Sequence, residues 1–242
     1  SAFDFRTPNA AVVALPATAS YVPPDADRHD DYVPVPPAVQ ALPKQERGVR
    51  RARAVPYELD VRSETDFSEG SVALAFHNSG KSAAVFQVRS TSIPGGPWTY
   101  TVGALERTSD HWAVRSRDLA TYDLAVHGPN GFFRSFEGSV NGTEKANLAV
   151  KLTYDAEPGV TLELQNHATT RARVRIVETY TRQTVTHVIE PGRLFLWHWP
   201  LQLSFGWYDF AINVESDATF EQRLAGHVET GCDSVSDPAL GW

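Results

Sequence analysis

The chain has 242 residues, enough for one large or two small domains, and 42% of them are apolar and 11% aromatic. This composition supports packed cores and argues against a wholly disordered protein. The formal net charge of −7 argues against nucleic-acid binding, and the sequence has no apolar run of the roughly 18 residues that a membrane-spanning helix needs.

The first ten residues, SAFDFRTPNA, lack the basic start and apolar run of a signal peptide, although an export signal could precede them in a longer chain. Cys232 is the only cysteine, so an intrachain disulfide is impossible and the fold must depend on packing. The cysteine count leaves the compartment open. Asn141, Gly142 and Thr143 match a glycosylation sequon, which we interpret as a turn between repeats.

Residues 1–56 differ from the rest of the chain, because they hold nine of its sixteen prolines. Proline fixes φ and lacks an N–H donor, so helices and central strands are both disfavoured here. We expect residues 21–39 to be extended and polyproline-like, either as a strap that lies on folded protein or as a flexible linker. The apolar side chains that a strap would use are Tyr21, Tyr32, Val33 and Val35.

A basic run follows at residues 44–53, with the sequence KQERGVRRAR. It includes Arg50 and Arg51, and such a run can hold phosphate groups or acidic lipid headgroups. On an acidic chain, the same run can instead pair with the protein's own carboxylates or face solvent. Both interpretations stay open.

From residue 57 onward, alternation of apolar and polar residues predicts short β-strands separated by turns. In the first half of this region, strands are expected at residues 57–62, 71–77, 84–89, 98–102 and 112–115. Ser109 and Asp110 are expected to form the turn before the last of these strands.

A predicted β-hairpin at residues 120–140 occurs a second time at residues 206–228. The two copies share an aromatic-Asp pair at the start and a glycine near the end: Tyr122, Asp123 and Gly138 in the first, and Tyr208, Asp209 and Gly226 in the second. At a shift of 88 residues, Val72, Leu74, Phe76 and Asn78 correspond to Val160, Leu162, Leu164 and Asn166. Since a hairpin cannot bury its apolar face alone, this duplication predicts a repeated β-unit.

These patterns predict an all-β protein: two tandem antiparallel β-sandwich domains preceded by an extended Pro-rich segment. The predicted boundaries are residues 1–56 for the preceding segment, 57–143 and 144–232 for the two repeats, and 233–242 for a C-terminal tail. One larger sandwich, formed by pairing of the two units, is the alternative.

The sequence has no GxSxG, HExxH or GxxxxGK[ST] motif, and its eight histidines show no metal-ligand spacing. We therefore expect no catalytic residue, no cofactor and no metal site in this chain. Asp123 and Asp209 recur in the two units, and we interpret them as turn-forming residues that accept nearby backbone N–H groups.

Aromatic residues gather between residues 194 and 208. With the basic run, they supply the candidate ligand-binding residues, which are Trp197, Trp199, Trp207, Tyr208, Arg50 and Arg51. Aromatic faces attract quaternary ammonium groups and suit membrane interfaces, so a choline headgroup or a lipid surface would fit them. Because Trp197 and Trp199 would share one face of a strand, a core position for this pair is the competing interpretation.

Four stretches of the sequence point to a known family. They are SAFDF at residues 1–5, QERGVRRARAVPYEL at 45–59, YDLAVHGPNGFFRSFEGS at 122–139, and WYDF followed by RLAGHVETG within 207–231. In this order they resemble the carboxy-terminal region of bacterial phosphocholine-preferring phospholipases C. The resemblance covers nearly the whole chain and includes the tandem repeat.

The resemblance implies that a large amino-terminal α/β domain, related to acid and alkaline phosphatases, carries the metal-dependent active site. That domain would cleave phosphatidylcholine or sphingomyelin to phosphocholine and diacylglycerol or ceramide. SAFDF looks like its last few residues, and the nucleophile and metal-ligand motifs of the family have no counterpart in this sequence.

The resemblance therefore implies a non-catalytic accessory region of a secreted bacterial enzyme, whose partner is the catalytic domain of the same polypeptide. The alternative is a lipid-surface or choline-headgroup binding module that uses the exposed Trp residues and the basic run, with a phospholipid membrane as its partner.

Overall fold

The computed structural model describes residues 31, 33, 38, 39, 47–115, 120–141, 145–155 and 159–241. These residues form β-strands and two short 3₁₀ helices, so the all-β prediction is confirmed. None of the helices among them is long and apolar enough to cross a membrane.

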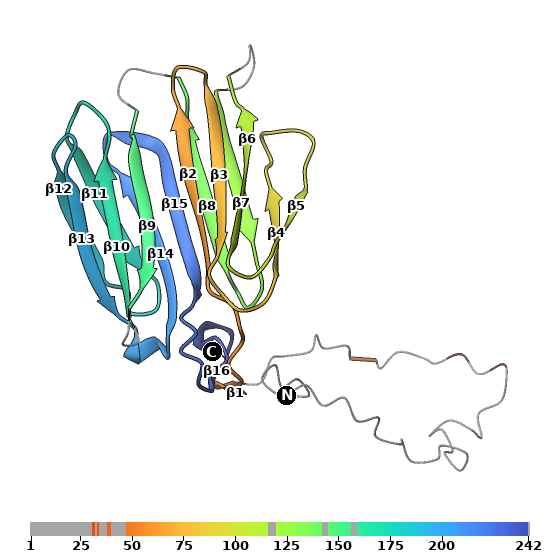
Figure 1. Cartoon of the computed structure of the whole chain (residues 1–242). Helices are drawn as coiled ribbons and strands as arrows, with labels where there is room; N and C mark the ends of the chain where they lie inside the picture. The colour runs from red at the N-terminus through yellow and green to blue at the C-terminus, as the bar shows by residue number, and fades with distance from the viewer. Residues whose placement is uncertain are drawn as a thin grey trace.

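The first unit is a two-layer sandwich (Figure 1). Its strands are β2 (Leu59–Asp66), β3 (Ser71–Asn78), β4 (Ala84–Arg89), β5 (Trp98–Val102), β6 (Glu106–Ala113), β7 (Thr121–His127) and β8 (Phe133–Ser139). One layer has the order β2-β3-β6, and the other contains β5, β4, β7 and β8. Apolar residues of β3 and β4, among them Leu74, Phe76 and Phe86, are fully buried between the layers, as the alternation predicts.

The second unit repeats this arrangement. Its strands are β9 (Leu148–Tyr154), β10 (Gly159–Asn166), β11 (Ala172–Glu178), β12 (Thr184–Ile189), β13 (Leu194–Pro200), β14 (Trp207–Val214) and β15 (Asp217–His227), with the 3₁₀ helix η1 (Gln202–Ser204) before β14. The equivalent residues Leu162 and Leu164 of β10 are fully buried. Each unit has its own hydrophobic cluster, as two tandem sandwiches require.

The two units join along a seam between β8 and β15 (Figure 1). These equivalent strands pair antiparallel, with Phe133 opposite Ala225 and Glu137 opposite Glu221. The pairing creates one eight-stranded sheet with the order β12-β11-β14-β15-β8-β7-β4-β5. The tandem arrangement and the pairing of units that we considered as its alternative therefore occur together.

The expected turn at Ser109 and Asp110 is wrong, because both residues lie in the middle of β6. This strand pairs only with β3 and is the edge of its sheet. An edge strand can hold polar residues that face solvent, so its sequence resembles that of a turn. Asp110 also accepts a hydrogen bond from the Tyr100 hydroxyl at 2.5 Å.

The repeated tyrosines and glycines are cross-strand partners. Tyr122 of β7 lies opposite Gly138 of β8, and Tyr208 of β14 lies opposite Gly226 of β15. A Cβ at Gly138 would lie 2.5 Å from the Tyr122 hydroxyl, and one at Gly226 would lie 2.8 Å from the Tyr208 hydroxyl. Each glycine therefore leaves the space that a buried tyrosine fills.

Below the sandwiches, the segment that precedes β2 meets the C-terminal tail (Figure 1). The short strand β1 (Arg51–Ala52) pairs with β16 (Ser234–Val235), ahead of the helix η2 (Pro238–Gly241). Backbone N–H of Arg50 donates to the Ser236 hydroxyl at 3.0 Å, and Ser236 N–H donates to Arg50 O at 2.7 Å. We call residues 47–56, 201–206 and 228–241 together the base.

Most of the Pro-rich segment falls outside the described residues. Val33 and Val39, which are described, are exposed. Tyr21, Tyr32 and Val35, as well as the sequon residues Gly142 and Thr143, lie outside the described part of the chain.

Candidate functional site

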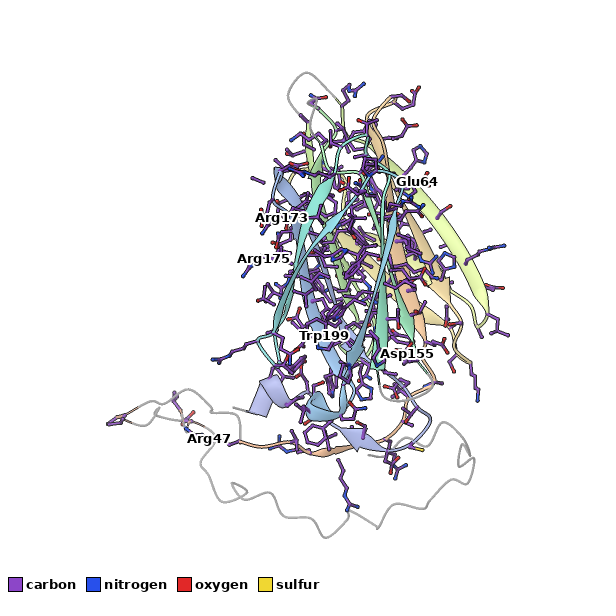
Figure 2. All side chains as sticks on the ribbon, turned by 90° about the vertical axis from the view of Figure 1, so that its left-hand side faces the viewer. Arg47, Glu64, Asp155, Arg173, Arg175 and Trp199 are labelled. Carbon is purple, nitrogen blue, oxygen red and sulfur yellow. The ribbon has the colours of Figure 1, made fainter. Side chains whose placement is uncertain are left out.

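The four aromatic candidate residues differ in how far they are buried. Trp199, Trp207 and Tyr208 are buried, and Trp197 is 38% exposed. Figure 2 shows Trp199 inside the sandwich, whereas Arg173 and Arg175 project from the outer face of β11. Of the pair Trp197 and Trp199, for which a core position was the competing interpretation, Trp199 lies in the core and Trp197 does not.

Trp199 has an equivalent in the first unit. It lies opposite Val160 of β10, just as Trp112 lies opposite Val72 of β3. Its ring packs edge-on against Phe210, with 5.3 Å between ring centroids. A buried ring at the same place in both copies is explained by packing within each unit.

Trp197 lies on an edge strand that differs between the units. In β13 the residues at 194–197 are Leu-Phe-Leu-Trp, and the equivalent residues of β6, at 107–110, are Arg-Thr-Ser-Asp. Leu194 and Leu196 are both more than half exposed. This flank is therefore more apolar than the fold of a unit requires.

The two basic candidates lie in the base, where Arg51 is opposite Val235, a residue that the buried Trp207 contacts. Arg51 belongs to β1, its side chain is exposed, and Figure 2 places the neighbouring Arg47 at the same end of the molecule. The buried Trp207 helps to hold the base in place, because its ring Nε1–H donates a hydrogen bond to Val235 O at 3.0 Å. The tail is thus fixed under the second unit.

Asp123 and Asp209 have different partners. Asp123 accepts hydrogen bonds from the hydroxyls of Ser90 and Thr91 and from Thr91 N–H at 2.9 Å, and so anchors a loop distant in sequence. Partial burial raises the pKa of Asp123, but the hydrogen bonds from Ser90, Ser92 and Thr91 outweigh it and hold the pKa well below its usual value. Asp209 instead pairs with Arg223 at 3.1 Å.

A nucleophile-like arrangement lies in the base, and the sequence analysis missed it. His227 Nδ1 lies 2.8 Å from Glu229 Oε1, and His227 Nε2 lies 3.0 Å from the Ser234 hydroxyl. Distances of this kind link nucleophile, base and orienting carboxylate in serine hydrolases. No local sequence motif indicates this cluster, because Ser234 lies near His227 only through the pairing of the tail with β1.

The carbonyl oxygen of Phe205 contacts both His227 and Ser234 in this cluster. It lies 3.1 Å from His227 Nε2 and accepts a hydrogen bond from the Ser234 hydroxyl at 3.1 Å. The Ser234 hydroxyl therefore donates to a backbone carbonyl, whereas a nucleophile would donate its proton to the imidazole. The hydrogen bonds of this cluster hold the C-terminal tail against the loop before β14.

A chain of hydrogen bonds crosses the interior of the seam. The buried Arg134 of β8 donates to the Tyr208 hydroxyl at 3.0 Å, and the Tyr208 and Tyr154 hydroxyls lie 3.1 Å apart. Tyr154 in turn donates to Leu59 O at 3.1 Å. Burial raises the pKa of Tyr154 well above its usual value, so its hydroxyl remains a donor. This series of hydrogen bonds crosses from one unit to the other twice, and it explains the fixed arrangement of the two units.

A cleft separates the units in the other layer. Here β2 and β9 are edges of separate sheets, and a cavity of about 880 Å³ between them is lined by Ser63, Thr65 and Val150, among others. Gln222 of β15 closes the inner side, and its side-chain amide donates to the Ser63 hydroxyl at 3.3 Å. Open strand edges of this kind can accept an added strand.

Within the described ranges, no three His, Cys, Asp or Glu side chains come together as metal ligands would. The described residues thus offer three separate surfaces: a hydrogen-bonded base, an exposed apolar flank on β13, and a cleft of mixed polarity between the units.

The chain matches a family model described as "Bacterial phospholipase C, C-terminal domain" over residues 51–139 and 148–227. It is 43% identical, over 99% of its length, to a protein of Burkholderia pseudomallei named non-hemolytic phospholipase C, of which it covers 35%. It is also 35% identical to the non-hemolytic phospholipase C of Pseudomonas aeruginosa, over 100% of the chain and 36% of that protein.

The hemolytic phospholipase C of Pseudomonas aeruginosa is 34% identical over 83% of the chain, which covers 31% of that protein. The chain therefore spans about a third of the length of these relatives. The two segments of the family model coincide with the two sandwich units, one from β1 to the end of β8 and the other from β9 to the end of β15.

Proposed function

Because the chain belongs to the family of bacterial phospholipase C C-terminal domains, we propose that it is a non-catalytic accessory region of a longer phospholipase C. In this proposal, the remaining part of the polypeptide cleaves phosphatidylcholine or sphingomyelin and releases phosphocholine. The chain docks on that part and helps to shape access to its active site.

The observation that carries the proposal is the Phe205 carbonyl, which occupies the one nucleophile-like cluster that we identified in the described residues. Phosphodiester cleavage needs an organised nucleophile or metal site. The buried polar groups of the seam also serve packing, because Arg134 bonds both to Tyr208 and to the protein backbone. These features suit a scaffold.

The location follows from the same proposal. Bacterial phospholipases C that act on membrane phospholipids must leave the cytoplasm to reach those of other cells, so we propose that the longer protein is secreted. Its catalytic domain is then the partner of this chain within one polypeptide, which agrees with the chain covering 35% of its relative from Burkholderia pseudomallei.

The second candidate function was a lipid-surface module built on Trp residues and the basic run. Burial of Trp199, Trp207 and Tyr208 leaves Trp197 as the exposed ring of that set. The accessory role therefore has more support than a choline-binding aromatic cage, which would need several accessible rings.

Hydrogen exchange of the isolated chain and of the same residues within the longer polypeptide tests the accessory role. We expect a continuous surface of this chain to exchange more slowly in the longer polypeptide, because docking protects backbone amides. Residues of the seam, such as Arg134 and Tyr208, are buried in either case and serve as the internal control. Equal exchange at every residue would contradict docking.

A further inference from the structure

Two large apolar side chains project from one loop of the base. Leu203 is 85% exposed and Phe205 is 50% exposed, and both lie on the loop between β13 and β14. Figure 1 places this loop at the same end of the molecule as β1 and β16. Exposed neighbouring apolar residues at one end of a molecule mark a contact surface.

The loop is held firmly in this position. Phe205 has a φ of 57°, a left-handed conformation that bulky residues rarely adopt. Its carbonyl oxygen accepts a hydrogen bond from Ser234, and the Ser204 hydroxyl donates to Trp207 O at 2.6 Å. A strained conformation that the surroundings maintain is a reason to look for a function.

The sequence of this loop differs between the two units. In the second unit the residues at 202–205 are Gln-Leu-Ser-Phe, after Trp199 and before Tyr208. In the first unit the residues at 115–119 are Arg-Ser-Arg-Asp-Leu, after Trp112 and before Tyr122. Counted back from the equivalent tyrosines, Phe205 corresponds to Leu119, whereas Leu203 corresponds to Arg117 and has no apolar counterpart.

A basic side chain accompanies the apolar pair. The exposed Arg51 of β1 lines a hollow of about 440 Å³ together with Phe205, Asp233, Ser234 and Val235. We propose that this part of the base contacts a phospholipid surface, with Leu203 and Phe205 among the acyl chains and Arg51 at the level of the phosphates.

The chemistry favours a zwitterionic surface. Asp233 lies in the same hollow as Arg51, and the net charge of the chain is −7, so a strongly anionic surface would repel the molecule. Phosphatidylcholine offers the phosphate without net negative charge. Two side chains on a short loop cannot supply the roughly 800 Å² per partner of a stable protein interface, but they suffice for reversible insertion into lipid. Lipid contact goes beyond the accessory role and does not depend on it.

Co-sedimentation of the purified chain with phosphatidylcholine vesicles tests this surface. We expect the chain to bind, and the double variant Leu203→Ser/Phe205→Asn to bind at least about tenfold more weakly, because two apolar side chains no longer leave water. Asparagine tolerates the left-handed conformation, so the loop is expected to keep its shape. Arg51→Gln should weaken binding by up to about fivefold.

The matched control is Leu105→Asn. Leu105 is 81% exposed and has a φ of 61°, but it lies in the first unit between β5 and β6. This variant loses an exposed leucine comparable to Leu203 and should bind like the unchanged chain. Trp197→Ala should also leave binding unchanged.

A second readout uses the exposed Cys232, the only cysteine, which precedes Asp233 in the base. An environment-sensitive dye on Cys232 should report a more apolar surrounding when vesicles are added, and the double variant should lose this change. Absence of binding by the unchanged chain, undiminished binding by the double variant, or an equal loss in Leu105→Asn would overturn the proposal.

Discussion

Arg134→Ala is expected to lower the free energy of unfolding by about 4 kcal/mol, the largest effect of any single substitution that we consider. The Arg134 side chain is fully buried and donates to Phe133 O at 2.8 Å, Ala225 O at 2.9 Å and the Tyr208 hydroxyl at 3.0 Å. Its guanidinium also lies 4.3 Å from the centre of the Phe132 ring. Alanine removes all three hydrogen bonds and leaves a cavity behind. Urea denaturation followed by fluorescence measures the loss.

Two further variants separate the contributions of packing, hydrogen bonding and burial to this loss. Arg134→Met fills most of the space but donates no hydrogen bond, so it should recover roughly half of the loss if packing and hydrogen bonding contribute equally. Arg223→Ala, on the paired strand β15, removes a partly exposed ion pair with Asp209 and should cost no more than about 1 kcal/mol. Equal effects of Arg134→Ala and Arg223→Ala would show that the seam does not depend on the buried arginine.

Asn166→Ala is expected to lower the free energy of unfolding by about 3 kcal/mol. The Asn166 side chain is fully buried, and its amide donates to Thr170 O at 2.8 Å and Ile189 O at 2.9 Å. Its side-chain oxygen accepts the N–H of Ala168 at 3.0 Å. Alanine would remove all three hydrogen bonds, of which the one to Ile189 O is buried. Thermal and urea unfolding measure the effect.

The duplication supplies a replicate and a control for this prediction. Asn78 occupies the same position in the first unit, where its amide donates to Val102 O at 3.1 Å, so Asn78→Ala should cost a similar amount. Asn213→Ala removes a bond to Glu221 from a partly exposed asparagine and should cost about 1 kcal/mol or less. If Asn213→Ala were as costly as the two repeat variants, burial of the repeated asparagines would not explain their effect.

The sequence predicts the strands well, because each buried strand shows its face by alternation. Val72, Leu74 and Phe76 all lie inside, and so do their equivalents in the second unit. The duplication added a second copy of every landmark. The turn predicted at Ser109 and Asp110 is wrong, because an edge strand can be as polar as a turn.

Contacts between the units could not be predicted in the same way. Alternation assigns the faces of β8 and β15 but does not say which strand edges will pair. Arg134 appears in the sequence as one polar residue of an alternating run, and only pairing of β8 with β15 encloses it. Likewise, Ser234 meets His227 because β16 pairs with β1, a contact between distant parts of the chain.

The aromatic candidates show the same limit. Period two correctly places Trp197 and Trp199 on one face, yet Trp199 is buried and Trp197 is partly exposed. The difference arises from neighbours on other strands, such as Phe210 beside Trp199. The exposed apolar residues of the loop before β14, Leu203 and Phe205, lie between predicted strands, where alternation carries no information.

The most direct test of the account is the turnover of phosphatidylcholine and of a soluble phosphocholine ester by the purified chain, measured beside the longer polypeptide that contains it. The account predicts turnover by the longer polypeptide and none by the chain, with Ser234→Ala leaving the activity of the longer polypeptide unchanged. Turnover by the chain alone that disappears in Ser234→Ala or His227→Ala would contradict it, since the cluster that the Phe205 carbonyl occupies would then be a reaction centre.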